Sequence, residues 1–453
     1  MSGPAVKTKP ELSAAAVFAR WQEQLQSAPQ ILVGLSGGLD SSVLLSLVCD
    51  LVDAEKITAV HINHGLSPNA DQWQQQSAEF CRSLGVRLHS ESVTVLETGR
   101  GLESAARDAR YRVFEKLLVE EGILLLGHHA DDQVETVLYR LLRGSGPKGL
   151  AGIPITRPLG RGKLLRPLLD WPKVAVENWA TKKQLSWIED ESNQQEQFDR
   201  NYLRRQVVPA LAERWPDYIQ GIRRSARHSA EADQLAESVA RADLGQLDVR
   251  SERAGWSLSL TGFNQLEALR QRNLLHYWPT FYGLAALGQN LVDEILNSLI
   301  SAREDSEPRV VRADIQLCRY RDRLYVLNLS GRPKVEDDVC LFWHSGELLV
   351  LPDGTRLNAQ PVRGEGLRID DVSQLTLRFR QGGERCQPAG RDRSNSLKKL
   401  LQEYGLEPWW RERIPLFYIE EQLVAVGDLW VCQGWQCGAD EEGLKITWQT
   451  NSL

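Results

Sequence analysis

The sequence predicts an α/β fold: a Rossmann-like parallel sheet in the N-terminal part, then a mainly helical middle domain and a small α+β C-terminal domain. The first observation is that strand and helix patterns alternate from Ile31 to about Leu142, which is typical of a parallel sheet covered by helices on both faces. The second is that polar clusters follow three of the predicted strands, beginning at Ser36, His61 and Gly127. Ligands bind beyond the carboxyl ends of the strands in such sheets, so we expect the functional site at this edge.

The composition is that of a globular protein with several domains. The 453 residues suffice for about three domains, and the hydrophobic (42%) and charged (25%) fractions are ordinary. We place the boundaries at residues 1–220, 221–330 and 340–453, with a Gly/Pro-containing linker at Ser330–Lys334. The net charge of −6 gives no overall sign of nucleic-acid binding, so a surface of that kind must be local.

The apolar residues and the cysteines indicate the compartment. No apolar run approaches the ~20 residues that span a bilayer, and the first residues carry no apolar signal core. The seven cysteines are scattered and contain no C-x-x-C pair, which favours reduced thiols over disulfides or a zinc site. We therefore expect a cytoplasmic protein with no membrane contact.

The first strand leads into a glycine turn and then a helix. An apolar run from Ile31 to Leu35 precedes Ser36-Gly37-Gly38, and helical spacing resumes near Val43. This geometry directs backbone N–H groups and a helix N-terminus at an anion, and glycine lets the backbone approach a phosphate closely. No lysine follows, unlike in the ordinary P-loop, and Asp40 suits Mg²⁺ better than phosphate. A plain strand-to-helix turn is the alternative.

Further strands and helices extend the predicted sheet. The expected strands are Ile57–Asn63, Val86–His89 and Ile123–Gly127, and the expected helices are Asp71–Leu84, Leu102–Glu121 and, beyond the sheet, Lys173–Lys183, Leu266–Trp278 and Gln289–Ala302. Closing strands are expected within Val310–Leu327. Four histidines fall at strand ends, where they could contact base, ribose or phosphate: His61, His64, His128 and His129. A zinc site built from them lacks thiolate partners.

A pair of carboxylates opens the helix after the fourth strand. Asp132 and Glu135 are three residues apart and therefore neighbours on one helix face. They could hold Mg²⁺, orient an amine or accept its proton. Simple N-capping is the alternative, since acids are favoured in a first helical turn.

Arg107 lies beside Arg110 and Tyr111, off the apolar stripe expected for its helix. Its guanidinium could bind a phosphate or a carboxylate bidentately. The alternative is an i,i+4 pair with Glu103, and the spacing alone does not separate the two.

Together these motifs resemble the PP-loop family of ATP pyrophosphatases and, within it, the tRNA(Ile)-lysidine synthetase family. The matching segments are Ser36–Ser42, His61–Leu66, Glu103–Tyr111, Gly127–Thr136, Arg143–Gly146, Asp190–Asn193, Arg200–Arg204, Gly383–Arg385, Leu397–Leu401 and Pro408–Pro415. The resemblance covers most of the chain and is weakest from about Gln246 to Gln374.

The resemblance implies a ligase that attaches free L-lysine to the wobble cytidine of the tRNA(Ile) with the CAU anticodon. ATP would adenylate the cytidine, and the lysine amine would then displace AMP. ATP and Mg²⁺ are the implied cofactors, with the metal at Asp40. The expected nucleotide-binding residues are Ser36, Gly37, Gly38, Leu39, Asp40, Ser41, His61 and His64. The expected catalytic residues are Asp40, Arg107, Asp132 and Glu135, with the last two binding and orienting the lysine.

Local basic clusters fit a tRNA partner. The expected tRNA-binding residues are Arg200, Arg204, Arg205, Arg385, Lys398, Lys399, Trp410 and Arg411. Basic groups interleaved with aromatic rings suit phosphate contacts and base stacking, while a solvated charged face is the alternative. For the C-terminal cluster, the resemblance implies recognition of the acceptor stem.

Three other functions compete with this reading. A tRNA 2-thiolation enzyme would have a similar loop but usually needs catalytic or cluster-binding cysteines. A glutamine-dependent amidotransferase would need a glutaminase domain before the loop. A catalytically inactive tRNA-binding protein would not need the Ser36–Ser41 string together with Asp132 and Glu135. The sequence leaves the oligomeric state open, with a homodimer as one option.

Overall fold

The computed structural model describes residues 11–65, 69–94, 102–189, 199–303, 308–312, 315–328, 339–344, 347–368 and 375–449. Leu66, the Glu103 side chain, the segment Asp190–Asn193 and the expected linker Ser330–Lys334 lie outside the described residues. The chain forms two compact units, residues 1–235 and 236–453, which are described separately. The three-domain boundaries remain a prediction.

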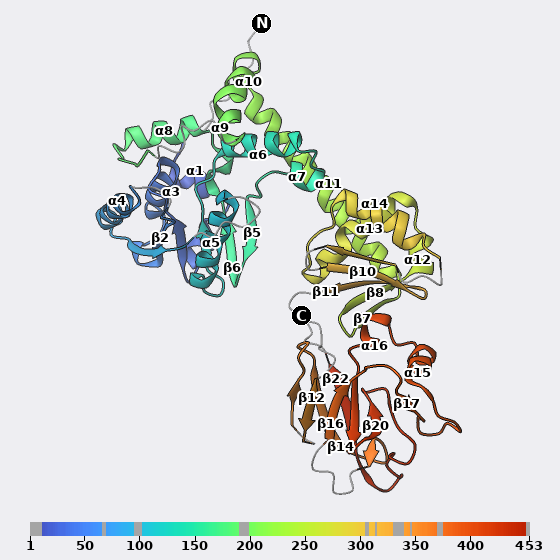
Figure 1. The fold of residues 1–453 in the computed structure, drawn as a ribbon. Coiled ribbons are helices and arrows are strands. Elements are labelled where there is room, and N and C mark those ends of the chain that lie inside the picture. Colours follow the sequence, from blue (N-terminus) through green and yellow to red (C-terminus); the bar gives the residue numbers. More distant parts are fainter. Residues whose placement is uncertain are drawn as a thin grey trace. The chain divides into compact units, whose positions relative to one another are not determined.

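A six-stranded sheet forms the centre of the first unit (Figure 1). It contains the four expected strands, whereas the strands Thr156–Leu159 and Gly162–Leu165 were not expected. In spatial order its strands are β3 (Arg87–Ser92), β2 (Ile57–Asn63), β1 (Ile31–Gly34), β4 (Ile123–Leu125), β6 (Gly162–Leu165) and β5 (Thr156–Leu159). All neighbours pair in parallel except β5, which is antiparallel to β6 at the edge. The chain order reverses between β1 and β4, so the carboxyl ends of these two strands are the expected ligand position.

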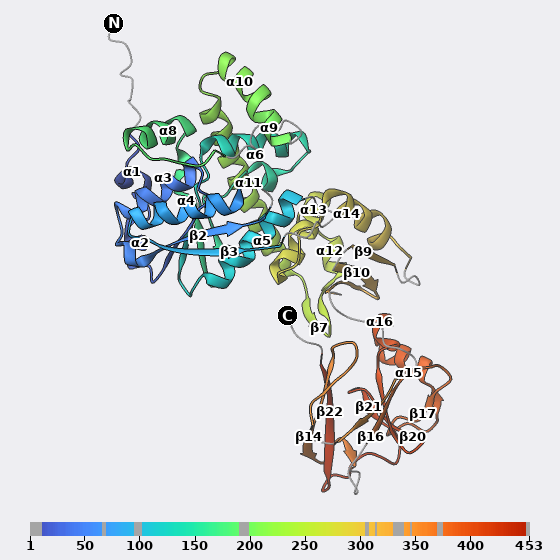
Figure 2. The same cartoon turned by 60° about the vertical axis from the view of Figure 1, so that its left-hand side comes forward.

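Helices cover both faces of this sheet (Figure 2). The helices along this part of the chain are α1 (Ala14–Phe18), α2 (Gln22–Ser27), α3 (Leu39–Cys49), α4 (Ala70–Ser83), α5 (Leu102–Leu117), α6 (Ala130–Leu142), α7 (Pro147–Leu150) and α8 (Lys173–Lys182), of which α7 packs on α6. Alternate residues of β1 point to opposite faces: Ile31 and Val33 pack with α3, and Leu32 packs with Phe114 of α5. The sheet is therefore buried on both sides, which explains its continuous apolar strands.

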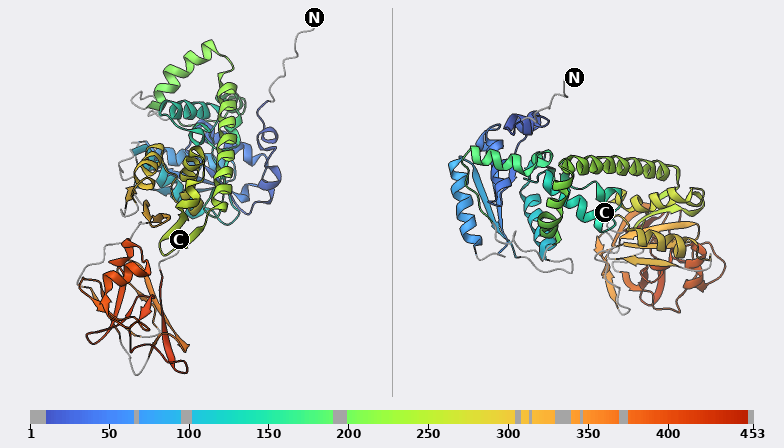
Figure 3. Two further views of the ribbon diagram at one scale, coloured as in Figure 1. Left: turned by 90° about the vertical axis from the view of Figure 1, so that its right-hand side faces the viewer. Right: turned by 90° about the horizontal axis from the view of Figure 1, so that it is seen from above.

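A helical segment closes the first unit. It consists of α9 (Asp199–Tyr202), the π-helical turn η4 (Leu203–Val207), α10 (Val208–Arg214) and the long α11 (Tyr218–Gln246), and α11 passes into the second unit (Figure 3). Both α9 and η4 contact α6. Single π-helical turns often occur at functional sites, and this one brings the Arg200–Arg205 cluster beside the helix that carries Asp132 and Glu135.

The second unit begins with a helical and antiparallel part. Its sheet has the order β7 (Val249–Glu252), β8 (Gly255–Ser259), β11 (Arg323–Asn328), β10 (Ile315–Tyr320) and β9 (Arg309–Arg312). Its helices are α12 (Leu260–Asn264), α13 (Ala268–Tyr277), α14 (Gln289–Glu294) and the π-helical η6 (Ile295–Ile300). Helices α13 and α14 with η6 and the closing strands were expected, but α12 was not. The β7–β8 hairpin was not, because Arg250, Ser251 and Glu252 have no apolar alternation.

The rest of the second unit is rich in strands. One sheet contains β12 (Cys340–Trp343), β16 (Leu375–Phe379), β19 (Pro415–Ile419), β20 (Gln422–Val426) and β21 (Trp430–Val431). Another contains β13 (Leu349–Val350), β14 (Arg356–Arg363), β22 (Glu442–Gln449) and β15 (Leu367–Arg368). A hairpin of β17 (Arg385–Cys386) and β18 (Asn395–Ser396) leads into α15 (Leu397–Tyr404) and α16 (Pro408–Arg411). The expected α+β character is confirmed. Within the described ranges, no helix has the length and apolarity to cross a bilayer.

Candidate active site

The loop between β1 and α3 is held in shape by its own hydrogen bonds. The Ser41 hydroxyl donates to the Gly38 carbonyl (3.0 Å) and accepts from the Ser36 N–H (3.2 Å). Gly37 has φ +84°, which favours glycine, and a Cβ there would lie 2.4 Å from Ile188 Cδ1, so the Ile188 side chain would have to move. Helix α3 begins after Gly38 with no side-chain cap. Its first N–H groups are therefore available to an anionic ligand.

The end of β4 packs directly on the start of α3. A Cβ on Gly127 would lie 2.9 Å from the backbone carbon and oxygen of Asp40, so only glycine permits this approach. The contact brings the segment His128–Asp132 next to the loop. These two strand ends are the ones that flank the reversal of the strand order.

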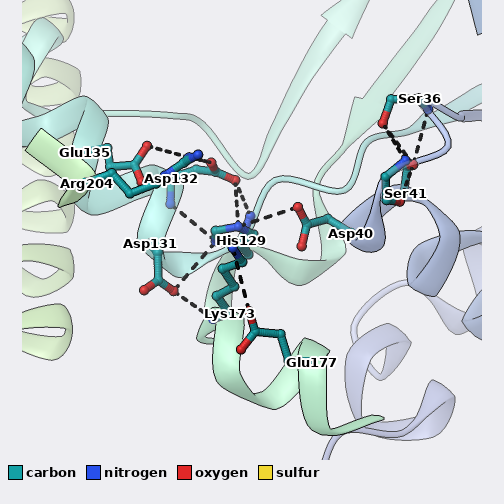
Figure 4. A network of polar contacts seen from close by, with 11 residues as sticks. Ser36, Asp40, Ser41, His129, Asp131, Asp132, Glu135, Lys173, Glu177 and Arg204 are labelled. Atoms are coloured by element: carbon teal, nitrogen blue, oxygen red, sulfur yellow. Dashed lines mark hydrogen bonds and ion pairs between the residues drawn. The ribbon is translucent and has the colours of Figure 1, made fainter. Parts of the chain in front are cut away.

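His129 organises the carboxylates of the site (Figure 4). It is only 3% exposed and caps α6: its Nδ1 accepts from the Asp132 N–H (3.4 Å), and its own N–H donates to Asp132 Oδ2 (2.9 Å). Its Nε2 lies 3.7 Å from Asp40 Oδ2 and 3.6 Å from Asp132 Oδ2. The N-capping alternative is therefore true of Asp132, but the same contacts also place its carboxylate beside the loop.

The sequence interpretation missed this role of His129. The H-x-x-D spacing from His129 to Asp132 is that of a capping box with histidine in place of Ser or Thr, and this signal could have identified it. Asp131 links two helices. Its Oδ2 accepts from the Lys173 N–H (2.7 Å) at the start of α8 and lies 3.6 Å from His129 Nδ1 at the start of α6.

Asp40 is a suitable ligand for a divalent cation. Burial raises the pKa of its carboxyl and the charge of Asp132 acts in the same direction, while His129 opposes them. The buried Oδ1 has no hydrogen-bond partner among the described residues. A bound Mg²⁺ would satisfy this oxygen and favour the ionised form.

Asp40 would not hold the metal through protein ligands alone. In the part of the chain that the structure describes, no group of three or more His, Cys, Asp or Glu side chains is arranged to hold a metal. Mg²⁺ usually takes one or two carboxylates together with substrate phosphates and water. The donor set therefore fits a metal that arrives with a nucleotide.

Asp132 and His128 have opposite protonation preferences. Burial alone would raise the pKa of Asp132, but His129, His128 and the hydrogen bond from the His129 N–H outweigh it, so its pKa lies below the ordinary value. Burial lowers the pKa of His128 to about 3, and Arg166 and Arg110 act in the same direction despite Asp132. At neutral pH the site thus holds an ionised carboxylate and a neutral imidazole.

Glu135 is bound by an arginine from the π-helical turn. Arg204 donates from Nε to Glu135 Oε1 (2.6 Å) and from a terminal nitrogen to Oε2 (2.9 Å), and it lies 3.8 Å from Asp132 Oδ1. Glu135 is 3% exposed, whereas its partner Arg204 is partly exposed, so this bidentate pair is shielded from water on the Glu135 side. Arg200 donates to Thr136 Oγ1 (2.9 Å) on the same helix. Their contacts with tRNA remain a prediction.

His61 and His64 lie at the end of β2 on the same edge. The His61 ring is buried with Nδ1 3.0 Å from the Leu35 carbonyl, so it links β2 to the loop. Burial lowers the pKa of both rings, and Arg110 adds to the effect on His64. Both are therefore neutral near pH 7, and their contact with a nucleotide remains a prediction.

Arg107 is not part of the carboxylate cluster that Asp40, Asp132 and Glu135 form. It lies in a neighbouring cavity, with a terminal nitrogen 3.4 Å from the Tyr111 hydroxyl. Tyr111 is buried against Phe114 rather than lying off the apolar stripe, because the face of α5 that packs on the sheet is broader than the spacing suggested. Only the charge of Arg107 reaches the site, through its effect on the pKa of His128.

The predicted tRNA-binding residues of the second unit divide into exposed and buried groups. Arg385, Lys398 and Lys399 are exposed on the β17–β18 hairpin and α15. Trp410 is 3% exposed and packs edge-on against Trp448, so its ring belongs to the core. Arg411 donates to the Leu406 carbonyl (2.9 Å) and to the Tyr320 hydroxyl (3.0 Å). These two residues hold α16 in place.

Comparisons with known proteins agree over most of the chain. Three family models match: a PP-loop domain at residues 10–211, a TilS substrate binding domain at 258–325 and a TilS substrate C-terminal domain at 375–448. A tRNA(Ile)-lysidine synthase of Coxiella burnetii is 38% identical over 427 residues, covering 93% of this chain and 94% of the relative. One of Serratia proteamaculans is 38% identical over 439 residues, covering 95% and 98%. A solved U34-tRNA thiolase of Methanococcus maripaludis, 16% identical with a TM-score of 0.39, covers 50% of this chain and 87% of its own, a likeness too weak to carry an argument.

Proposed function

We propose a residue-level mechanism for this chain, which belongs to the tRNA(Ile)-lysidine synthase family. It is an ATP-dependent ligase that forms lysidine on tRNA(Ile). The observation that carries the mechanism is that the Ser36–Ser41 loop and the carboxylates of α6 meet at one point, joined through His129. We assign free L-lysine as the amine donor and the wobble cytidine of the CAU anticodon as its acceptor.

In the first step the loop binds ATP. The N–H groups at the start of α3 and the Ser36–Ser41 turn receive the phosphates, and Asp40 contributes its unpartnered Oδ1 to the metal site. Mg²⁺, when bound there, neutralises the phosphate charge and makes pyrophosphate a better leaving group. The O2 atom of cytidine forms a bond to the α-phosphorus, and the bond from that phosphorus to the bridging oxygen breaks.

In the second step the lysine amine attacks C2 of the adenylated base. The C2–O2 bond breaks and AMP leaves with that oxygen, while the amine loses a proton. Asp132 is held ionised and lies beside the loop, so it attracts and orients the ammonium group before the attack. Glu135 is already neutralised by Arg204, which supports assigning it to position the amine by hydrogen bonding rather than by net charge.

The basic clusters provide the tRNA contacts in this scheme. We assign Arg200, Arg204 and Arg205 to the RNA near the reaction centre. Arg385, Lys398 and Lys399 are exposed and suit contacts with the phosphate backbone. Trp410 and Arg411 act indirectly, by supporting the surface that carries them.

The remaining assignments follow from the proposed reaction. A cytoplasmic location places the enzyme with tRNA, ATP and free lysine. The reaction uses residues of one chain, so a homodimer is not required by the mechanism, and light scattering would decide the oligomeric state. The 2-thiolation alternative is not favoured, because the curated relatives are lysidine synthases over nearly their whole length.

A single assay tests the function. The purified protein is incubated with ATP, Mg²⁺, isotope-labelled lysine and a tRNA(Ile) transcript with the CAU anticodon, and the nuclease digest is analysed for lysidine by mass spectrometry. The expected result is one lysine incorporated per tRNA, with equimolar AMP and pyrophosphate. A transcript with uridine at the wobble position is the matched control and should not react. Absence of lysine incorporation into the CAU transcript would contradict the proposal.

A further inference from the structure

A cavity of about 530 Å³ lies beside the loop site and is not used by the mechanism above. Five arginines from α5, α6, β5 and the end of β6 line it: Arg107, Arg112, Arg140, Arg157 and Arg166. Asp108 and Glu115 are the carboxylates at its wall. We call this cavity the arginine pocket.

The arginines of the pocket are held by neutral groups in the part of the chain that the structure describes. Within the described ranges, none of the five arginines forms an ion pair with a carboxylate. Arg140 donates to the carbonyls of Gly149 (2.9 Å) and Gly152 (2.8 Å), and Arg166 donates to that of Pro154 (2.6 Å). Neutral acceptors fix the orientation of the guanidinium groups but leave their charge uncompensated.

The guanidinium group of Arg166 is buried away from water. The residue is 1% exposed, and its Nε has no hydrogen-bond partner among the described residues. Burial lowers its pKa, and repulsion from Arg157 and Arg107 adds to this, although Tyr111 opposes it. Burial likewise lowers the pKa of Arg140, with Arg107 contributing. Like charges that repel one another around a buried guanidinium are stabilised by an anion.

The same positive charges act on the pKa of Tyr111, and the contacts of its ring limit the choice of ligand. Burial would raise the pKa of its phenol, but Arg107, Arg166 and Arg157 outweigh it, so the pKa lies below its ordinary value. The guanidinium groups of Arg107 and Arg157 lie 5.0 Å and 4.7 Å from the centre of its ring. Its ring is therefore already covered by cations, which favours a phosphate ligand over a stacked base.

The arginine pocket lies on the same edge of the sheet as the loop site. Arg166 directly follows β6, and His128 follows its parallel neighbour β4, whose last residue Leu125 pairs with Leu165. The charges of Arg166 and Arg107 act on His128. An RNA strand that inserts one base at the loop must pass its adjoining backbone along this edge.

We propose that the arginine pocket binds the phosphodiester groups of the RNA strand next to the base that reacts. This inference rests on the proposed function, because it requires a polynucleotide substrate. The chemical class of the ligand is a phosphate anion. We commit to the RNA backbone rather than to pyrophosphate, because the Ser36–Ser41 loop is a separate site built for the nucleotide.

The test compares two arginines of one hairpin. Arg157 lines the pocket, where its side chain donates to the adjacent Pro158 carbonyl and lies against Tyr111. Arg161 is exposed in the β5–β6 turn and does not line the pocket. Arg157→Gln is expected to weaken binding of tRNA(Ile) about tenfold at low salt. It should also reduce the slope of log affinity against log salt by about 0.7 to 0.9. Arg161→Gln should change neither quantity.

Further measurements separate the proposal from its competitors. Arg112→Gln, at an exposed position on the pocket wall, should also reduce the slope of log affinity against log salt, by a smaller amount. This second variant keeps the test valid if Arg157→Gln misfolds. The KM for ATP and inhibition by pyrophosphate should stay unchanged. An unchanged salt slope in both pocket variants overturns the proposal, and so does a change in pyrophosphate inhibition without a change in tRNA binding. If the wild-type protein binds the tRNA but forms no lysidine, the proposed function fails while the pocket result stands.

Discussion

The carboxylate cluster and the arginine pocket lie on one edge of the same sheet, but they differ in the sign of their charge and in how that charge is paired. In the cluster, Glu135 accepts hydrogen bonds from Arg204, and Asp132 accepts one from the His129 backbone N–H. Asp40 Oδ1 has no hydrogen-bond partner among the described residues. In the pocket, arginines are oriented by carbonyls and by Tyr111 without a described carboxylate to pair with. The cluster thus suits a further cation at Asp40, and the pocket suits an anion.

The two regions also differ in how rigidly they are built. The capping box at the start of α6 fixes His129 and Asp132 through the backbone, so their positions are set when the helix forms. Arg107 is exposed on α5 and reaches only Tyr111 through its long side chain. A chemical step requires fixed atoms, whereas an exposed side chain such as Arg107 can adjust to a polymer backbone beside the fixed Arg140 and Arg166.

The largest expected effect is at Asp40. Asp40→Ala removes the oxygen that suits the metal, and pyrophosphate release should fall by about 10³-fold or more. Binding of tRNA should change less than about twofold, because the arginine pocket is untouched. Pyrophosphate release and filter binding are measured on the same preparation. Substantial activity in Asp40→Ala would remove its assigned role.

The next effect is expected at Arg204, which neutralises the carboxylate cluster. Arg204→Met leaves Glu135 buried without its partner, and the free energy of unfolding should fall by about 1–3 kcal/mol, allowing for the partial exposure of Arg204. The KM for lysine should change because the charge around Glu135 changes. Denaturant unfolding and lysine titration measure the two quantities.

A double variant is the control for this pair. Glu135→Gln combined with Arg204→Met removes both charges, so much of the lost stability should return while activity does not. If the double variant is as unstable as the sum of the single variants, the bidentate pair is not the source of the loss.

Arg107 tests whether the two regions act separately. It lies in the pocket, and its predicted role is catalytic. Arg107→Gln should lower the rate of pyrophosphate release at saturating tRNA by about tenfold. Arg157→Gln should affect tRNA binding and leave that rate unchanged. If Arg107→Gln changes only the KM for tRNA, then Arg107 belongs with the backbone contacts.

The smallest effect is a pair of opposite changes in stability. The folded-state pKa of Asp132 is lowered, so its ionised form stabilises the fold above about pH 4 and this contribution is lost as pH falls through that pKa. The pKa of Asp40 is raised, so its contribution is present below about pH 4 and is lost as pH rises through the folded-state value. At pH 7, Asp132→Asn should lower the melting temperature and Asp40→Asn should raise it. Both differences should shrink toward pH 3, and shifts of the same sign would contradict the assignment.

The sequence by itself determined the parallel sheet, the glycine loop and the helix that carries Asp132 and Glu135. These features depend on periodic apolar residues and on glycines at turns, which act over a few neighbouring positions. The motifs also determined the family, because they recur as strings along most of the chain. The β7–β8 hairpin was not predicted, because its strands are polar and short.

Only the tertiary structure decided which charges meet. His129 lies between Asp40 and Asp132 because β1 and β4 are neighbours in the sheet, and Arg204 reaches Glu135, 69 residues away, because the π-helical turn packs on α6. The arginine pocket likewise gathers residues from four elements with no common spacing. Contacts of this kind follow from the order of strands and the packing of helices, and no local pattern in the sequence encodes them.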